Sequence, residues 1–396
     1  GEGAMLRSGF LALGAALRRS SGVRPSAPRF RLAPGVRYAQ RTFASDSDQG
    51  YTVVGIGDCE MKVPVPKKPE LVPVGFGLGN QEDQETLKHL RWMLQKFSLG
   101  QDIFLLGGPG PRRRRLAFHI CELAGLELEY VRLTRDTTEA DLKQRRDISG
   151  GNATWTDQAP VRAALHGRVL ILDGMEKAER NVLPTLNNLL ENREMPLSDG
   201  RMLVSPARYD ALRQTLSPEE IASSGLVRVS PYFRVIGLGL PVPRYPGFPL
   251  DPPLRSRFQA RAVGALQPEA VVTALGSGVV EALGKPKLQS LLRAAEALHV
   301  LEDSDVKLAA LHLHDPGLVK VARTLALFPD ACPASVLRRH YPYHLQLLST
   351  GASQQQPPKA AQGGAGGKDA GPGEATVVDG VLKRFGLRPK LAAGAA

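Results

Sequence analysis

The sequence predicts an α/β protein with a parallel sheet flanked by helices, followed by a small domain made only of helices. Three observations lead to this fold class. Short apolar segments, typical of buried strands, alternate with longer segments whose apolar residues recur at helical spacing. Strands separated by helices of this size pair in parallel, because the chain must cross back over the sheet between them. After Phe258 only the helical spacing continues, so no further strand is expected.

The elements of the α/β region follow from local patterns. Alternation of short apolar runs with prolines predicts a loop-rich lead-in over residues 44–82, with two strands within residues 51–80. Helical spacing predicts helices over residues 83–100, 112–126, 159–166 and 182–192. Apolar runs predict core strands over residues 102–106, 129–133, 169–172 and 233–240. Asp199-Gly200 predicts a hairpin within residues 194–204.

Composition divides the chain into domains. The α/β core is predicted over residues 83–262, and Leu, Ala and Val at helical spacing predict an all-helical domain over 263–348. Residues 349–376 are low-complexity Gln, Gly, Pro and Ala, which predicts a disordered linker. Residues 377–396 form a short C-terminal remnant that begins with an amphipathic stretch.

An arginine-rich segment opens the chain. Residues 5–43 contain eight arginines and no Asp, Glu or Lys, which is typical of a mitochondrial transit peptide. Arg41-Thr42-Phe43 followed by Ala44 resembles the arginine-minus-three pattern of matrix processing. We therefore expect a disordered presequence over residues 1–43 and a mitochondrial matrix location, with residues 1–4 extraneous. The alternative is a disordered basic arm.

The overall composition excludes several classes of protein. The net charge of the 396 residues is +12, but residues 1–43 carry +7 of it, so the remainder is only mildly basic. No zinc finger or aromatic-rich sheet accompanies the arginines, and no nucleic-acid partner is expected. No apolar run is long enough for a transmembrane segment. The three cysteines form no short-spaced pair, which argues against a disulfide scaffold or a cysteine zinc site.

The central motif is a glycine-rich turn between a predicted strand and a predicted helix. That context is typical of the phosphate-binding loop G-x-x-x-x-G-K-[ST]. We take eight residues as the candidate nucleotide-binding loop: Gly107, Gly108, Pro109, Gly110, Pro111, Arg112, Arg113 and Arg114.

Three positions of this loop differ from the pattern. Arg112 replaces the glycine that lets the backbone approach phosphate closely. Arg113 replaces lysine and keeps the positive charge. Arg114 replaces the hydroxyl residue that ligates magnesium, and its charge opposes the metal. Phosphate attraction can therefore survive while metal-assisted hydrolysis is impaired. The alternative is a basic, proline-stiffened helix start that binds nothing.

An acidic strand end is the second half of such a site. Apolar residues 169–172 lead to Asp173, the candidate magnesium-associated acid. Gly174 follows where a catalytic glutamate is expected, and Glu176 stands two residues further on. Glu176 is a candidate for reaching the site by a side route. The alternative for Glu176 is a solvated or structural role.

Two further positions complete the candidate site. Leu240 stands at the end of a core strand, where a polar sensor is expected. Arg257 precedes Phe258 at the domain edge, where an arginine can reach the nucleotide of a neighbouring subunit as a finger. The alternative for Arg257 is a surface salt bridge.

The order of these motifs resembles the AAA+ ATPase superfamily, and within it the dynein-related and MoxR-like branch. The resemblance implies a P-loop NTPase core with a helical lid over residues 263–348, ATP and Mg2+ as cofactors, and further AAA+ modules or subunits in a ring as partners. It implies ATP hydrolysis as the family activity, with turnover by this module in doubt. The alternative function is a catalytically inactive AAA+ scaffold or partner-docking module.

Overall fold

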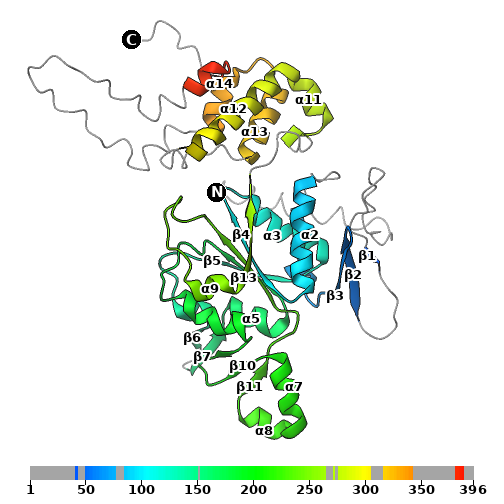
Figure 1. Cartoon of the computed structure of the whole chain (residues 1–396), viewed down its shortest axis with the longest axis vertical. Helices are drawn as coiled ribbons and strands as arrows, with labels where there is room; N and C mark the ends of the chain where they lie inside the picture. The colour runs from blue at the N-terminus through cyan, green and yellow to red at the C-terminus, as the bar shows by residue number, and fades with distance from the viewer. Residues whose placement is uncertain are drawn as a thin grey trace, which may run out of the picture. The chain divides into compact units, whose positions relative to one another are not determined.

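The computed structural model of the chain describes residues 41–42, 50–76, 84–149, 152–264, 271–272, 275–304, 315–341 and 380–387. The predicted linker and all of the predicted presequence except Arg41–Thr42 lie outside these residues. Figure 1 shows the described elements, with the α/β core from cyan to green and the following helices from yellow to red.

The core is a five-stranded sheet in the order β13-β4-β12-β8-β5 (Figure 1). Every adjacent pair is parallel, so the prediction of a parallel sheet is confirmed. Leu238 of β12 is in register with Leu105 of β4 on one side and with Asp173 of β8 on the other. The carboxyl ends of these strands therefore meet at one edge, where ligands of parallel sheets bind. The five strands are β4 (Asp102–Gly107), β5 (Leu128–Arg132), β8 (Val169–Asp173), β12 (Arg234–Gly239) and β13 (Phe258–Val263).

Side-chain alternation along the strands supplies two hydrophobic clusters, one on each face. Ile103 and Leu105 belong to one cluster, whereas Phe104 between them belongs to the other. The same alternation separates Ile171 from Leu172. Each fully buried side chain of this size contributes about 1.5–3 kcal/mol. Helices on both faces therefore stabilise the strand ends that carry the candidate site.

Helices on both faces cover these clusters. α2 (Gln84–Ser98) and α3 (Arg112–Ala124) bury apolar residues in the cluster of Ile103, and α5 (Ala159–His166) buries them in the cluster of Phe104. α3 and α5 both end in a glycine with left-handed backbone, Gly125 and Gly167. Gly125 therefore ends α3, and the amino end of the helix directly follows the glycine-rich turn.

The expectation that strands stop after Phe258 is wrong. β13 begins at Phe258 and pairs with the whole of β4, from Phe258↔Asp102 to Val263↔Gly107. It is an edge strand whose burial alternates, with Gln259 and Arg261 between apolar residues. Such a strand lacks the continuous apolar run that marks the central strands of a parallel sheet.

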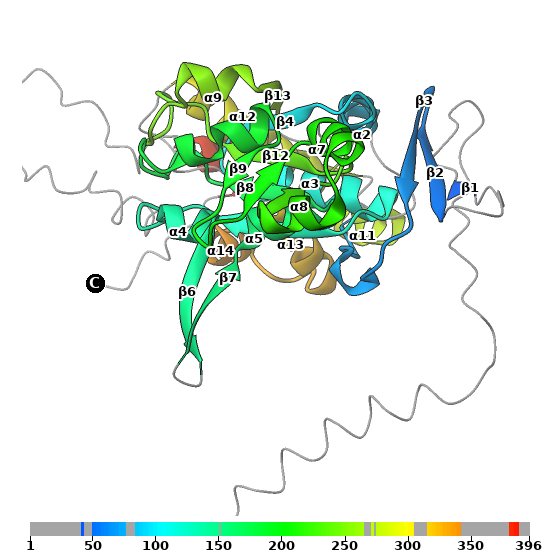
Figure 2. The same ribbon diagram turned by 90° about the horizontal axis from the view of Figure 1, so that it is seen from below.

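The segment between β5 and α5 contains a two-stranded ribbon that the sequence analysis did not predict. β6 (Gln144–Ser149) and β7 (Asn152–Asp157) pair antiparallel and project from the helices beside them (Figure 2). At its base the buried amide of Gln144 donates hydrogen bonds to Asp157 and Asp199. The short helix α4 (Glu139–Leu142) precedes the ribbon.

The region between β8 and β12 differs in part from the prediction. In place of one helix over residues 182–192, a 3-10 turn, η2 (Leu183–Leu186), leads into a short α6 (Asn187–Glu191). The predicted hairpin is present, because β9 pairs antiparallel with β10. Elements in this region are β9 (Met195–Pro196), β10 (Met202–Val204), α7 (Pro206–Thr215), α8 (Pro218–Ser223) and β11 (Leu226–Arg228).

The lead-in is a small antiparallel sheet of β1 (Arg41–Thr42), β2 (Tyr51–Ile56) and β3 (Cys59–Pro64), followed by the 3-10 turn η1 (Pro69–Leu71). Val54, Ile56 and Val63 are buried against α2 in the cluster of Ile103. β1 lies inside the segment that was expected to be disordered. It is ordered here because it pairs with β2.

The described part of the lid is helical, as predicted. α11 (Ser277–Leu283), α12 (Lys285–Ser304), α13 (Asp315–Leu327) and α14 (Pro333–His340) share one hydrophobic cluster. Leu382 and Leu387 of the C-terminal remnant are buried in the same cluster. Residues 380–387, the described part of the remnant, therefore belong to the lid in space, although the predicted linker separates the two in sequence.

Candidate functional site

The candidate loop runs from the end of β4 into the first turn of α3. Gly107 pairs with Val263 at the end of the β4–β13 ladder, and a Cβ added to Gly107 would overlap the carbonyl oxygen of Val263. Gly110 has a φ of 131°, a region that favours glycine. Pro109 and Pro111 have no N–H groups, so this loop has fewer backbone donors for an anion than the G-x-x-x-x-G-K-[ST] pattern allows.

Arg113 is the loop side chain that is best placed to receive an anion. Its Nε and Nη1 atoms are buried and make no hydrogen bond within the described part of the chain. Burial lowers the pKa of Arg113, and the carboxylates of Glu176 and Asp173 oppose that shift. A buried cation with unused donors is costly unless an acceptor reaches it. The side chain at the lysine position of the motif therefore fits an anionic ligand such as phosphate.

The side chain of Arg112 contacts α2 and the residue after β13 instead. Its Nη1 donates to the carbonyl oxygen of Gly264 at 2.8 Å, and its Nη2 lies 3.3 Å from Oε2 of Glu85 on α2. Arg112 thus connects the start of α3 to α2 and to the end of β13. These contacts are structural, although Nε and Nη2 of Arg112 are also buried without hydrogen-bond partners among the described residues.

Arg114 occupies the place where the motif predicts a metal-ligating hydroxyl, and it pairs directly with Asp173. Its Nε and Nη2 lie 2.9 and 2.7 Å from Oδ2 of Asp173. The hydroxyl of Tyr130 on β5 donates to the same oxygen at 2.6 Å. The Arg114 guanidinium also lies 5.8 Å from the centre of the Tyr130 ring, within range of a cation–π contact. We call this group the Arg114–Asp173–Tyr130 triad.

The triad is partly enclosed. The side chain of Asp173 is 14% exposed and that of Arg114 is 48% exposed. Burial, followed by the hydrogen bond to Asp173, raises the pKa of Tyr130 to about 12. The tyrosine therefore stays protonated at neutral pH and remains a donor. An exposed ion pair contributes only about 0–1 kcal/mol to stability. The main effect of the triad is therefore on ligand binding rather than on the stability of the fold.

Glu176 is buried at the same edge of the sheet. Its side chain accepts a hydrogen bond from the backbone N–H of Leu240 at 3.2 Å, and its carbonyl oxygen accepts one from Phe248. Glu176 is only 4% exposed, so it is not solvated. Gly174 makes the reversal after β8 with a φ of 86°. The carboxylate of Glu176 thus contacts the residue that follows β12. Its negative charge favours the protonated form of Arg113.

Arg257, the candidate finger, is held within its own chain. Its guanidinium donates to the carboxylate of Glu191 on α6 and to the carbonyl oxygen of Pro253 on α9 (Pro252–Ser256). Its side chain is only 17% exposed. The structure brings the loop and Asp173 together through Arg114. The partners of Arg257, in contrast, lie on α6 and α9.

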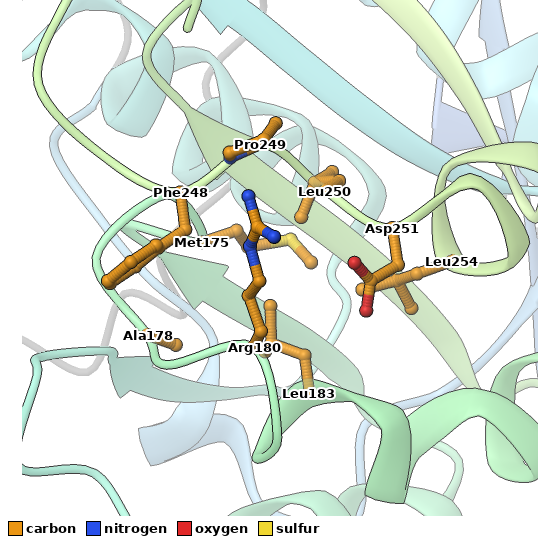
Figure 3. Close-up of a pocket in the computed structure, with 9 residues that line it drawn as sticks. All are labelled: Met175, Ala178, Arg180, Leu183, Phe248, Pro249, Leu250, Asp251 and Leu254. Carbon is orange, nitrogen blue, oxygen red and sulfur yellow. The ribbon is translucent and has the colours of Figure 1, made fainter.

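A separate pocket opens beside the turn that follows β8. Figure 3 shows the side chain of Arg180 extending through the middle of it, in front of Met175, with Asp251 to one side. It is a shallow pocket, and its empty space of about 230 Å³ includes open solvent. None of the candidate loop residues lines it, so this pocket is not the predicted phosphate site. Its lining residues are Met175, Ala178, Arg180, Leu183, Phe248, Pro249, Leu250, Asp251 and Leu254.

Magnesium does not fit the site as it is built. The Oδ2 atom of Asp173 already accepts hydrogen bonds from Arg114 and Tyr130, and the guanidinium of Arg114 brings a positive charge to this carboxylate. No cluster of three or more His, Cys, Asp or Glu side chains suited to a metal ion occurs among the described residues. The residues that would hold the ion in related sites therefore hold an internal cation instead.

Two site residues were not predicted. Tyr130 lies on β5, beside the strand that carries Asp173, and Tyr245 is buried near Gly108 and acts on Arg113. Tyr130 could have been found from its place near the carboxyl end of a core strand. Tyr245 lies in an irregular segment, and no local signal marks it.

Comparison with known proteins defines the class. Residues 102–258 match the AAA domain of the dynein-related subfamily, from the start of β4 to the start of β13. Residues 102–258 therefore form an AAA domain, as the motifs of this region indicated.

Among individual proteins, the chain is 46% identical over 372 residues to von Willebrand factor A domain-containing protein 8 of Mus musculus, covering 94% of this chain and 18% of that protein. It thus spans less than a fifth of that relative. Protein NorQ of Paracoccus denitrificans is 29% identical over 29% of this chain and 47% of its own length. Midasin of Giardia intestinalis is 27% identical over 32% of this chain and 3% of its own length. Within the described residues, no helix is both long and apolar enough to cross a membrane.

Proposed function

We propose that this chain is an ATP-binding AAA+ module with weak or no hydrolysis of its own. The observation that carries the proposal is Arg113, whose buried Nε and Nη1 lack hydrogen-bond partners among the described residues. The side chain lies at the amino end of α3, where backbone donors and the helix dipole also favour a negative charge. A phosphate group supplies the acceptors that Arg113 lacks.

Weak hydrolysis follows from the residues around the proposed phosphate. Gly174 leaves the position after Asp173 without a carboxylate to activate water. Glu176 is engaged by the backbone of Leu240. Arg114 supplies no hydroxyl and covers Asp173. Each of these features removes a group on which phosphoryl transfer to water depends.

Calorimetric titration of the full chain with ATP tests the proposal. We expect a heat of binding and a rise in the unfolding temperature at millimolar ATP, because a ligand that binds only the folded state stabilises it. Release of inorganic phosphate should stay near that of a protein-free control. Absence of both heat and thermal shift would contradict ATP binding, and rapid phosphate release would contradict the inactive site.

A second candidate function is a non-enzymatic scaffold that completes a ring or docks a partner. Arg114 and Arg257 favour it, because each is held by an acid of its own chain, Asp173 and Glu191. The scaffold needs no nucleotide, so it predicts normal assembly when Arg113 is reversed in charge. If the chain binds ATP, its partners are neighbouring AAA+ modules or subunits. To act as a finger, Arg257 would have to leave Glu191 and bind the nucleotide of a neighbour.

For location, we propose that residues 1–43 direct the protein to the mitochondrial matrix. Their eight arginines without Asp, Glu or Lys support this. Residues 1–43 fused to a fluorescent protein should bring it into the matrix, and replacing Arg18 and Arg19 with Glu should abolish import. A diffuse cytosolic signal from the unaltered fusion would overturn the proposal.

A further inference from the structure

We propose that this site binds ATP without a divalent cation, with the guanidinium of Arg114 in the place of Mg2+. The inference rests on the proposed ATP-binding function and specifies the form of nucleotide that the site takes. It starts from the triad, in which one oxygen of Asp173 accepts from Arg114 Nε at 2.9 Å and from Tyr130 at 2.6 Å.

The first argument is geometric. A metal ion on Asp173 would have to displace a charged side chain with two nitrogens on the same carboxylate oxygen. Tyr130 adds a third donor to that oxygen and its ring faces the guanidinium. Charge-assisted hydrogen bonds of this kind are about twice as strong as neutral ones. The Oδ2 atom of Asp173 is therefore engaged before any ligand arrives.

The second argument is charge balance. Arg113 keeps the positive charge of the lysine in the motif, and Arg114 adds a further positive charge at the position of the metal-ligating hydroxyl. Arg113 is buried with unused donors, and the side chain of Arg114 is half exposed. Mg2+ placed between these two side chains would be repelled by both, whereas a metal-free triphosphate would be attracted by both.

The experiment compares ATP titrations of the full chain in EDTA and in excess MgCl2. We expect the two dissociation constants to agree within about threefold, well below the tenfold change that corresponds to about 1.4 kcal/mol. Binding only in MgCl2 would overturn the metal-free site while leaving the proposed function intact. Binding in neither condition would overturn the proposed function itself.

Arg114→Thr restores the hydroxyl of the motif and removes the internal cation. We expect this variant to bind ATP about tenfold more weakly in EDTA than in MgCl2, because it loses a charge-assisted contact and frees Asp173 for the metal. Arg145→Thr is the matched control, since Arg145 is an exposed arginine that pairs with Asp141 away from the loop. A metal dependence that is the same in the Arg114 variant and the wild type would contradict the inference.

Asp173→Asn provides an independent test. If Asp173 only holds Arg114, loss of its negative charge should tighten ATP binding in EDTA by about threefold, because an anion then meets one fewer like charge. If Asp173 ligates a metal, the same variant should weaken ATP binding in MgCl2. Thermal unfolding without nucleotide shows whether each variant is folded.

Discussion

Replacing Arg113 with methionine is expected to weaken ATP binding about a hundredfold, because truncating a buried charged contact costs roughly 2–5 kcal/mol. The folded chain should not lose stability. Methionine fills a similar volume without the cost of a desolvated cation, whose Nε and Nη1 have no hydrogen-bond partners in the described structure. The measurements are ATP titration by calorimetry and the urea midpoint of the nucleotide-free protein. Binding lost at unchanged or higher stability is the pattern of a functional site.

The conservative variant Arg113→Lys separates charge from shape. It keeps a positive charge but not the planar donor group, so it should retain part of the affinity. Arg145→Met is a control for loss of an exposed arginine and should bind ATP like the wild type. If Arg113→Met instead unfolds at lower urea and still binds ATP normally, Arg113 is a structural residue and the phosphate site lies elsewhere.

Gly107→Ala is expected to destabilise the α/β core by about 3 kcal/mol, the upper end of the range for overpacking. The added methyl group would overlap the carbonyl oxygen of Val263. Because that atom belongs to the backbone of β13, no side-chain rotation relieves the overlap, and the edge strand must move away from β4. Urea denaturation followed by circular dichroism measures the loss, and ATP affinity should fall with it because the loop begins at this residue.

Gly108→Ala is the matched control one position along the loop. A Cβ on Gly108 would meet only the hydroxyl of Tyr245 at 3.5 Å, an ordinary van der Waals distance. We expect its stability to stay within about 0.5 kcal/mol of the wild type, as for most substitutions without a clash. Equal stability of the two alanine variants would mean that β13 does not confine the start of the loop.

The sequence could predict the interior of the sheet because buried parallel strands carry their signal locally. The apolar runs that end at Leu106, Leu172 and Leu240 all correspond to central strands. β13 was missed because an edge strand alternates polar and apolar residues. The ribbon of β6 and β7 was missed for a related reason. Its residues around Ile148 and Trp155 are exposed, so no buried face imposes a hydrophobic pattern.

The candidate site was predictable where it depends on one stretch of chain, and not where it depends on pairing between strands. The loop and Asp173 follow from motifs of a few residues. That Tyr130 shares an oxygen of Asp173 with Arg114 depends on the register of β5 against β8, which no local pattern specifies. The same limit applies to Glu176, whose burial is set by the distant backbone around Gly247 and Leu240.

The burial of Leu382 and Leu387 among the lid helices has a consequence for the order of folding during synthesis. The five strands are all available once the ribosome has passed Val263, so the sheet can form on the nascent chain. The lid lacks two of its apolar side chains until residue 387 has emerged. A nascent chain therefore presents a finished β-sheet unit while its helical unit still exposes an incomplete hydrophobic surface to chaperones.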